Sequence, residues 1–375
     1  MSAISSQSND SPVVFVGTYT EPEGSQSEGI YVYRMDSSSG KLAFETVLKG
    51  VVNPAFLAIH PRQGFLYAVN EVQSFAGQAG GGVSAISIHS TSGELTLLND
   101  QFSHGEDPCY VSVEQTGQFA LAANYTSGSV AMFPIQTDGR LGPATEVIQH
   151  SGSSVHPERQ TGPHAHCILP DPTNRFAIVA DLGLDKILIY RMDLEGGKLH
   201  KHAEVDVQAG AGPRHLTFHP NGQYAYLINE LNATLTGYRY HVDAGTFEEL
   251  QTVPALLEDF KGENLCADLH VSPNGKYLYA SNRGHDSIVC FLIDENTGRL
   301  TYRNHTPTGG REPRNFAISP DGTFLLVANQ KTHNIVTFKI DPGTGQLLDT
   351  GHEVEVSMPV CLKFAYLNPR YGVGV

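Results

Sequence analysis

The side chains best suited to chemistry lie at equivalent places of a phrase that recurs along the chain. Each copy begins at an anchor residue, usually Pro, and closes with Asn or Asp after an apolar stretch. Seven candidates lie near the anchors: His164, His166, Arg214, His215, Asp268, Arg314 and Asn315. Five more lie at or shortly after the closing residue: Glu71, Asp181, Glu230, Arg283 and His285. If the phrase marks a repeated structural unit, the two sets converge on one place.

Arginine, histidine and carboxylate groups without an obvious nucleophile indicate an anionic substrate and acid–base chemistry. Arg binds phosphate or carboxylate through paired hydrogen bonds. A His whose pKa lies near neutrality activates water, which contributes a factor of roughly 10²–10⁴ to a rate. A second Arg or His stabilises an oxyanion, where one donor is typically worth about 3–4 kcal/mol. Attack of water on an activated ester, such as a lactone, requires no more than this.

Other chemistries find less support. His164 and His166 lie two residues apart on an expected strand and point the same way, but no further ligand follows at metal-binding spacing, so we predict neither metal nor cofactor. The sequence has no GxSxG elbow, no phosphate-binding loop and no dinucleotide fingerprint. Cys109 and Cys361 lie in the same rows, where Cys is more often a small buried residue than a nucleophile.

A structural interpretation of the charged residues also stays open. Arg214 with Glu230, and Arg283 with Asp268, would then form a self-satisfied network that only closes the channel. Desolvating several charges on a channel wall costs several kcal/mol each unless they are paired or serve a ligand. Because pockets at the mouths of closed β-architectures are common ligand sites, we favour a ligand.

The phrase itself predicts the fold. It reads PAFLAIHPRQGFLYAVN from Pro54, PRHLTFHPNGQYAYLIN from Pro213 and PRNFAISPDGTFLLVAN from Pro313, with variants from Pro108, Pro163 and Cys266. The copy from Pro163 is aligned with two extra residues in its turn. A third and a fourth strand follow each copy, and four strands per roughly 50 residues are typical of propeller blades. We predict an all-β, seven-bladed β-propeller with four antiparallel strands per blade.

Comparison of the blades separates scaffold from site. Three residues after the anchor, six of the seven residues are apolar and His166 is the exception. The closing Asn is nearly uniform, which indicates turn chemistry, and Asp181 occupies the same slot. The two residues after each anchor open the innermost strand and line the channel. The residue after the closing Asn should lie at the same mouth, because neighbouring strands run antiparallel.

The two ends of the chain complete the seventh blade. The N-terminal part offers three strands, VVFVGTYT, GIYVYRM and KLAFETVL, and VCLKFA near the C-terminus supplies the missing innermost strand. Pairing the C-terminal strand with these three closes the ring and leaves no open sheet edge. We expect a flexible N-terminal tail over residues 1–11, the propeller over 12–364 and a C-terminal tail over 365–375.

Composition limits the partners. A formal net charge of −15 repels phosphate backbones and anionic lipid, so we expect neither nucleic acid nor membrane as a partner. No apolar stretch approaches the roughly 18 residues of a membrane span, and the first residues lack the basic start and apolar core of a signal peptide. Five widely spaced cysteines without CxxC fit free thiols in a reducing cytoplasm. We expect a monomer or a simple homo-oligomer.

Several motifs resemble one known family. GPHAH (162–166), GPRH (212–215), INE (228–230), SNRGHDSI (281–288) and EPRNF (312–316) are similar to motifs of the seven-bladed propeller lactonases. That family contains propeller-type 6-phosphogluconolactonases and 3-carboxy-cis,cis-muconate lactonising enzymes, and the likeness covers residues 12 to 364. It implies metal-independent lactone chemistry with a catalytic set of His164 or His166, Arg214, Glu230 and Arg283. Family members often carry Glu where this chain has Asp268, which retracts that carboxylate by one methylene.

The residues and the resemblance together predict hydrolysis of a small anionic sugar lactone. The first expectation is 6-phospho-D-glucono-1,5-lactone, an intermediate of the pentose phosphate pathway. One of the two GPHAH histidines activates water, Arg214 and Arg283 bind anionic oxygen, Glu230 orients Arg214 or a His, and Arg314 helps to hold phosphate. The remaining substrate contacts are expected from His215, Asp268, His285, Asn315, Asp181 and Glu71.

Two alternatives stay open. One is a muconate cycloisomerase, in which a proton is delivered to carbon and no water is activated. The other is a non-catalytic propeller that binds a sugar acid or a protein, because a fold alone does not determine a function.

Overall fold

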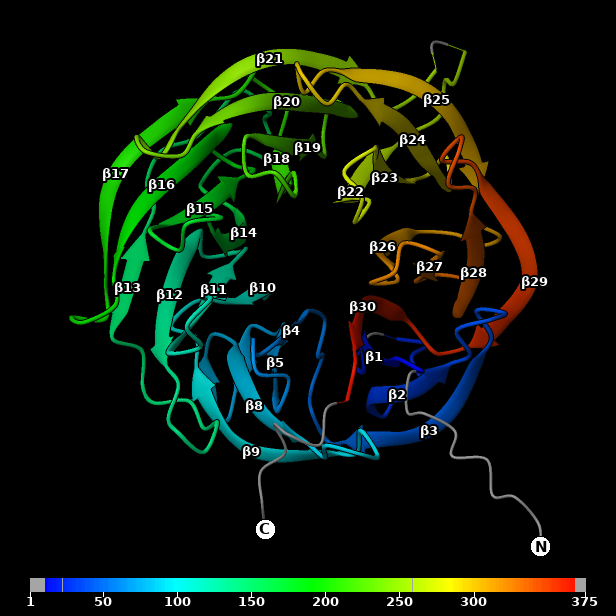
Figure 1. Cartoon of the computed structure of the whole chain (residues 1–375). Coiled ribbons are helices and arrows are strands. Elements are labelled where there is room, and N and C mark those ends of the chain that lie inside the picture. The colour runs from blue at the N-terminus through cyan, green and yellow to red at the C-terminus, as the bar shows by residue number, and fades with distance from the viewer. Residues whose placement is uncertain (1–10, 22, 258, 368–375) are drawn as a thin grey trace, which may run out of the picture.

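The computed structural model describes residues 11–21, 23–257 and 259–367, and these form strands joined by turns and loops. Seven four-stranded antiparallel sheets stand around a common centre (Figure 1). The predicted all-β, seven-bladed propeller is therefore confirmed. Most of the two predicted tails, residues 1–10 and 368–375, lies outside the described residues.

Blades 1 to 3 each run from an innermost to an outermost strand in chain order. Blade 1 contains β4 (Leu57–Ile59), β5 (Phe65–Asn70), β8 (Gly82–Ile88) and β9 (Leu95–Phe102), with the short hairpin β6 (Ser74–Phe75) and β7 (Gln78–Ala79) after β5. Blade 2 contains β10 (Pro108–Val113), β11 (Phe119–Asn124), β12 (Ser129–Pro134) and β13 (Glu146–Gln149). Blade 3 contains β14 (Ala165–Pro170), β15 (Phe176–Asp181), β16 (Lys186–Asp193) and β17 (Lys198–Asp206).

Blades 4 to 6 repeat this order. Blade 4 contains β18 (Pro213–Phe218), β19 (Tyr224–Asn229), β20 (Thr234–His241) and β21 (Thr246–Pro254). Blade 5 contains β22 (Leu265–Val271), β23 (Tyr277–Arg283), β24 (Ser287–Ile293) and β25 (Leu300–Pro307). Blade 6 contains β26 (Pro313–Ile318), β27 (Phe324–Asn329), β28 (Asn334–Ile340) and β29 (Leu347–Glu355).

Blade 7 closes the ring from both ends of the chain, as predicted. Its order is β30 (Pro359–Ala365), β1 (Val13–Thr18), β2 (Gly29–Met35) and β3 (Leu42–Lys49). The red β30 and the blue β1 lie side by side in Figure 1, and Leu362 is the partner of Val16. Ala365 still pairs with Val13, so the last strand runs one residue beyond the predicted boundary.

The second strand of each blade is apolar along its length because neighbouring blades cover both of its faces. Every residue of β11, β15, β19, β23 and β27 is buried. The closing Asn then bonds the backbone of the segment that enters the blade: Asn70 Nδ2 donates to Val52 O at 3.0 Å and Asn329 Nδ2 to Thr308 O at 3.1 Å. The slot is therefore structural, as expected, but in these two blades the Asn side chain holds the entering segment rather than the local turn.

A bulge opens the innermost strands and corrects the alignment of blade 3. Pro213 pairs with Asn229, and the register then shifts by one residue at Arg214. In blade 3 the pairing partner of Asp181 is Ala165. Ala165, rather than Pro163, therefore occupies the anchor position, and the two extra residues precede the strand instead of lengthening the turn.

This correction changes the position of both GPHAH histidines. His166 occupies the bulge position of Arg214 and Arg314, and the fully buried Ile168 occupies the core position to which His166 was assigned. His164 lies just before β14. The pairing also aligns blade 7 with the other blades. There Thr18 pairs with Pro359 and so occupies the closing slot, and Tyr19 follows it as Glu230 follows Asn229 in blade 4.

Candidate active site

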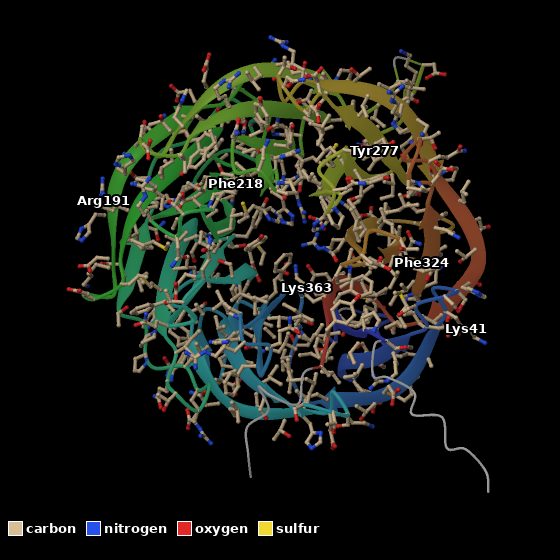
Figure 2. All side chains as sticks on the ribbon, in the orientation of Figure 1. Lys41, Arg191, Phe218, Tyr277, Phe324 and Lys363 are labelled. Carbon is tan, nitrogen blue, oxygen red and sulfur yellow. The ribbon has the colours of Figure 1, made fainter. Side chains whose placement is uncertain are left out.

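Most predicted site residues meet where the innermost strands begin and the second strands end. A narrow pocket of about 10 Å³ is lined there by Ala55, Phe56, Glu71, Cys109, Arg214, His215, Arg314, Asn315 and Val360. Figure 2 shows side chains filling the centre of the ring around Lys363, whereas Arg191 lies on the outer rim.

Glu230 is at the centre of the charged cluster. Its Oε2 accepts hydrogen bonds from Arg214 Nε at 3.0 Å and Arg283 Nη2 at 2.8 Å, and its Oε1 accepts from Arg159 Nη2 at 2.6 Å. Burial alone would raise the pKa of Glu230, but Arg283, Arg214 and Arg159 outweigh burial and lower the pKa to about 2. Burial, Arg283 and Arg314 lower the pKa of Arg214 to about 10. The carboxylate and Arg214 are both charged near neutral pH.

The structure contradicts the expected pair of Arg283 with Asp268, whereas the pair of Arg214 with Glu230 is present. Arg283 instead donates to Glu230 and to the carbonyl oxygens of Leu265 and Cys266. The reason is depth in the channel: Arg283 follows the closing Asn at the mouth, while Asp268 lies further along β22 in the row of His215.

Asp268 organises a second cluster with histidines. It accepts from His215 Nδ1 and His270 Nε2, each at 2.9 Å, and from the Asn315 amide. Burial alone would raise the pKa of Asp268, but His270 and His215 hold it well below its usual range. Burial and Arg214 lower the pKa of His215 to about 3, so His215 is neutral and Asp268 ionised at pH 7. Asp268 therefore orients His215, with Arg214 Nη1 3.2 Å from the other ring nitrogen.

The two GPHAH histidines have different surroundings. His164 is half-buried, its Nδ1 lies 2.9 Å from Tyr125 O, and its ring stacks on the Tyr125 ring at 4.6 Å between centroids. His166 is buried, with Nδ1 3.5 Å from Cys109 Sγ. Burial, Arg214 and His215 lower the pKa of His166 well below its usual value. Burial and Glu71 raise the pKa of Cys109 well above its usual value, so Cys109 is a thiol rather than a nucleophilic thiolate.

Arg314 stands on the opposite side of the pocket with few partners. Its Nη2 lies 3.6 Å from Glu71 Oε1, and its guanidinium lies 5.5 Å from the centroid of the Tyr19 ring. Tyr19 Oη donates to Glu71 Oε1 at 2.8 Å. Among the residues that the structure describes, Arg314 donates no hydrogen bond within normal geometry, although its side chain is only 18% exposed. Most of its five donors are left for a ligand.

Two predicted residues lie away from this cluster. Asp181 has no exposed surface, and its Oδ1 accepts from the backbone N of His164 at 2.7 Å. His285 Nδ1 bonds Ser287 Oγ at 2.6 Å, and its ring packs against Phe260 and His305. Asp181 therefore holds the segment before β14, and His285 faces the loop between blades.

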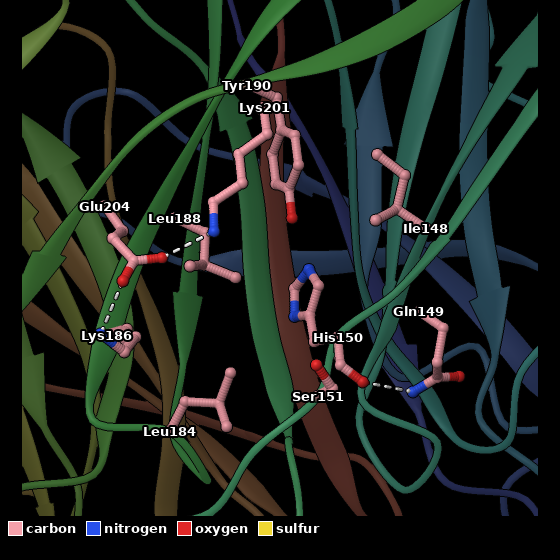
Figure 3. A pocket seen from close by; sticks show the side chains of 10 residues that line it. All are labelled: Ile148, Gln149, His150, Ser151, Leu184, Lys186, Leu188, Tyr190, Lys201 and Glu204. Carbon is pink, nitrogen blue, oxygen red and sulfur yellow. Dashed lines mark hydrogen bonds and ion pairs between the residues drawn. The ribbon is translucent and has the colours of Figure 1, made fainter.

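A larger hollow of about 340 Å³ lies between blades 2 and 3, apart from the cluster (Figure 3). Ile148, Leu184 and Leu188 form its apolar walls, and Lys201 pairs with Glu204 at 2.8 Å. His150 points into it and bonds Asp181 Oδ2 through Nδ1 at 2.7 Å. Because Asp181 also accepts a hydrogen bond from the His164 backbone, the contact between His150 and Asp181 helps to fix the position of His164.

Sequence reasoning did not predict four residues of the cluster: Tyr19, Tyr125, Arg159 and His270. Tyr19 and Tyr125 follow the closing slots of blades 7 and 2. Tyr125 was part of the comparison of that position but, as an uncharged residue, was not selected, and the comparison did not extend to Tyr19. His270 lies two residues after Asp268, on the same face of β22. Arg159 lies in the loop between β13 and β14, outside the repeat, and no spacing pointed to it.

The fold and this arginine-rich channel mouth define a seven-bladed β-propeller with a candidate site at one end of its channel. The chain belongs to the lactonase family with a seven-bladed β-propeller, whose model matches residues 13–364. A 6-phosphogluconolactonase of Bacillus subtilis is 38% identical over 94% of this chain and 98% of its own length, and one of Formosa agariphila is 35% identical over 81% and 86%. The structure of a periplasmic gluconolactonase from Pseudomonas aeruginosa superposes with a TM-score of 0.90 at 34% identity, over 96% of this chain and all of the other.

Two further properties concern the described residues alone. They contain no group of three or more His, Cys, Asp or Glu side chains placed to hold a metal ion. Nor does any helix among residues 11–21, 23–257 and 259–367 have the length and apolar character to cross a membrane.

Proposed function

We propose that this protein hydrolyses 6-phospho-D-glucono-1,5-lactone to 6-phosphogluconate. The observation that carries the proposal is a surplus of cations at the mouth: the guanidinium groups of Arg159, Arg214, Arg283 and Arg314 pair with two carboxylates, Glu71 and Glu230, and the ionised Asp268 deeper in the channel is bound by His215 and His270. In a chain of net charge −15, this local excess supports an anionic substrate. The named activities of the relatives support the phosphorylated lactone.

His164 is the base in this proposal. Tyr125 O only accepts hydrogen bonds, so His164 Nδ1 carries the hydrogen and the neutral ring has its lone pair on Nε2. A water molecule attacks the lactone carbonyl carbon and passes its proton to this nitrogen. Burial and Arg214 lower the pKa of His166, which therefore serves as a neutral hydrogen-bonding partner. Asp181 acts as a positioning residue through the His164 backbone.

Arg214 and Arg283 stabilise the negative charge that develops on the carbonyl oxygen. Glu230 holds both guanidinium groups in place before substrate arrives, so little reorganisation is needed during the reaction. The tetrahedral intermediate then collapses as the bond between the carbonyl carbon and the ring oxygen breaks. The ring oxygen takes the proton back from His164, and one water molecule has been added to give the open-chain acid.

Arg314 helps to hold the phosphate, because most of its donors have no protein partner. His215, Asp268 and Asn315 form the deeper wall against which the substrate rests. All five cysteines are free and buried, which supports a reducing compartment, the cytoplasm. The named activity of the relatives supports a place in the pentose phosphate pathway.

The test is hydrolysis of freshly generated 6-phosphogluconolactone, coupled to 6-phosphogluconate dehydrogenase and corrected for spontaneous opening. Glucono-1,5-lactone and a carboxymuconate serve as comparison substrates. Arg214→Ala should lower turnover of the phosphorylated lactone at least about 100-fold because an oxyanion donor is lost. Arg191→Ala on the outer rim (Figure 2) is the control and should keep wild-type turnover.

The outcomes separate the candidate functions. Near wild-type turnover in a folded Arg214→Ala protein would remove this residue from the mechanism. Turnover of the carboxymuconate alone would identify a cycloisomerase. Binding of a sugar acid without turnover of any of the three compounds would identify a binding propeller.

A further inference from the structure

We propose that Arg159 binds the phosphate group of the substrate and thereby selects phosphorylated over unphosphorylated lactones. This inference rests on the proposed function and assigns its specificity to a residue outside the blade repeat. Arg159 lies in the loop between β13 and β14, close to both the base and the oxyanion arginines, since it contacts Tyr125 Oη at 3.1 Å and Glu230 Oε1 at 2.6 Å.

The loop that carries Arg159 is held in place by its own hydrogen bonds. Gln160 is fully buried and donates from Nε2 to Leu182 O at 2.8 Å. Its backbone O accepts from Ser154 N at 2.9 Å, and its Oε1 accepts from His156 N at 3.0 Å. The His156 ring accepts from the backbone N of Arg159 at 3.2 Å. Arg159 is thus presented over the mouth before substrate binds, which reduces the entropic cost of binding.

The guanidinium of Arg159 uses only part of its donor capacity. Both of its hydrogen-bond acceptors, Tyr125 Oη and Glu230 Oε1, are bound through Nη2. Within the part of the chain that the structure describes, Nε and Nη1 have no hydrogen-bond partner. Arg donors in this fork geometry match two oxygens of a phosphate. Glu230 does not depend on Arg159 alone, because Arg214 and Arg283 also bind its carboxylate.

Exposure separates the four mouth arginines into two pairs. The side chains of Arg159 and Arg314 are 32% and 18% exposed. Those of Arg214 and Arg283 are only 2% and 8% exposed. A phosphate dianion is the part of the substrate that is most costly to strip of water, so it belongs with the exposed pair. The less polar lactone ring then enters beside the buried pair, where its carbonyl oxygen meets Arg214.

The experiment compares kcat/KM for 6-phosphogluconolactone and glucono-1,5-lactone in Arg159→Gln. Loss of a charge-assisted phosphate contact should lower kcat/KM for the phosphorylated lactone by about 10- to 100-fold. The value for the unphosphorylated lactone should change less than threefold, on the order of an exposed polar substitution. Arg159→Lys, which keeps the charge, should recover part of the loss.

Arg34→Gln is the matched control, because Arg34 is 27% exposed and also pairs with a glutamate, Glu45, at 3.0 Å on the outer part of blade 7. It should leave both substrates unaffected. Equal losses on the two lactones in Arg159→Gln would overturn the proposal, since Arg159 would then act through Glu230 on the reaction itself. Unchanged kinetics on both would overturn it as well.

Product binding separates this inference from the proposed function. If the wild-type protein opens neither lactone, the proposed function fails, and calorimetric titration with 6-phosphogluconate and gluconate still tests Arg159. Tighter binding of 6-phosphogluconate that is lost in Arg159→Gln would support the phosphate contact. Equal affinities of the two proteins for 6-phosphogluconate would reject it.

Discussion

A single carboxylate sets the geometry of the channel mouth. Glu230 is 4% exposed at its side chain and receives three guanidinium groups from two blades and a loop. Burying such a group costs several kcal/mol in desolvation, which pairing only partly repays, so a buried network of this kind is weak evidence for stability alone. Its value lies in orientation: Arg214 and Arg283 are fixed relative to each other by one acceptor atom, Oε2.

Glu230 also predicts how stability depends on pH. Its pKa is about 2 in the folded protein and 4.5 when unperturbed, so the unfolded chain takes up the proton first. The stabilisation is complete above about pH 4.5 and decreases as the pH falls toward 2. By this linkage Glu230→Gln should be less stable than wild type at pH 6, and the difference in free energy of unfolding should shrink by about 2 kcal/mol at pH 3.

Urea unfolding at the two pH values measures this difference. Glu248→Gln, at a side chain that is 60% exposed on β21, is the control and should show no comparable change. A difference between wild type and Glu230→Gln that is independent of pH would mean that the carboxyl group titrates alike in both states.

Single residues of the site were predictable where the repeat supplied a comparison. Arg214, Glu230 and Arg283 stood out because several of their counterparts in other blades are apolar or uncharged, and the structure brings them into contact. Of the two expected ion pairs, only that of Arg214 with Glu230 formed. Which charged side chains meet depends on how deep each one lies in the channel, and the alignment of the blades does not give that depth. Arg159 could not be predicted, because a loop residue has no counterpart in the other blades.

At the scale of the strand, a bulge determines which side chains reach the mouth. In blades 2, 4 and 6 the register shifts directly after the anchor Pro, at Cys109, Arg214 and Arg314. A bulge adds one residue to one strand and re-aims its side chain. The same shift in blade 3 falls at His166. The bulge therefore directs four different side chains, those of Cys109, His166, Arg214 and Arg314, toward the channel mouth.

The closing blade depends on a close approach that only glycine allows. A Cβ added to Gly17 in β1 would lie 2.3 Å from the backbone oxygen of Pro54 and 3.2 Å from Cys361 Cβ in β30. Gly17→Ala should therefore lower the free energy of unfolding by about 1–3 kcal/mol through overpacking. Thermal unfolding measures the effect. In Gly343→Ala the nearest atom would lie 3.4 Å away, at a side chain, so that variant should unfold like wild type.

The elements were the most predictable level of the structure. Apolar alternation and Gly-containing turns recur in every blade, so a wrong strand assignment in one copy can be recognised by comparison with the others. The exception is blade 3, where Pro163 imitates the anchor although Ala165 takes its place in the pairing. The spacing between anchors could not distinguish Pro163 from Ala165 as the anchor. A Pro two residues before the strand and a turn with two extra residues give the same sequence pattern.

At the scale of the whole molecule, the innermost strands form a ring of side-chain contacts. Phe56 of blade 1 stacks on Tyr110 of blade 2 at 4.1 Å between ring centroids. From blade 2 to blade 5 the contacts are Cys109 with His166, the His166 ring with the His215 ring, and His215 with Asp268. From blade 5 back to blade 1 they are Asp268 with Asn315, Asn315 with Leu362 N, and Cys361 Sγ with Leu57 N. The site and the closure of the propeller therefore share residues.

This ring predicts a stability effect at a residue that also lines the pocket. Asn315 Oδ1 accepts from Leu362 N at 2.7 Å, and its amide donates to Asp268. Asn315→Ala would leave a buried N–H in the closing blade without a partner, which costs about 1–3 kcal/mol. Each blade contacts only its two neighbours, so loss of the contact between Asn315 and Leu362 weakens the closed ring as a whole. The variant should therefore still unfold in a single transition, at a lower temperature than wild type. Asn296→Ala, at an exposed position, should keep the wild-type midpoint. Equal midpoints for both variants would show that closure rests on the β1–β30 pairing without help from the channel wall.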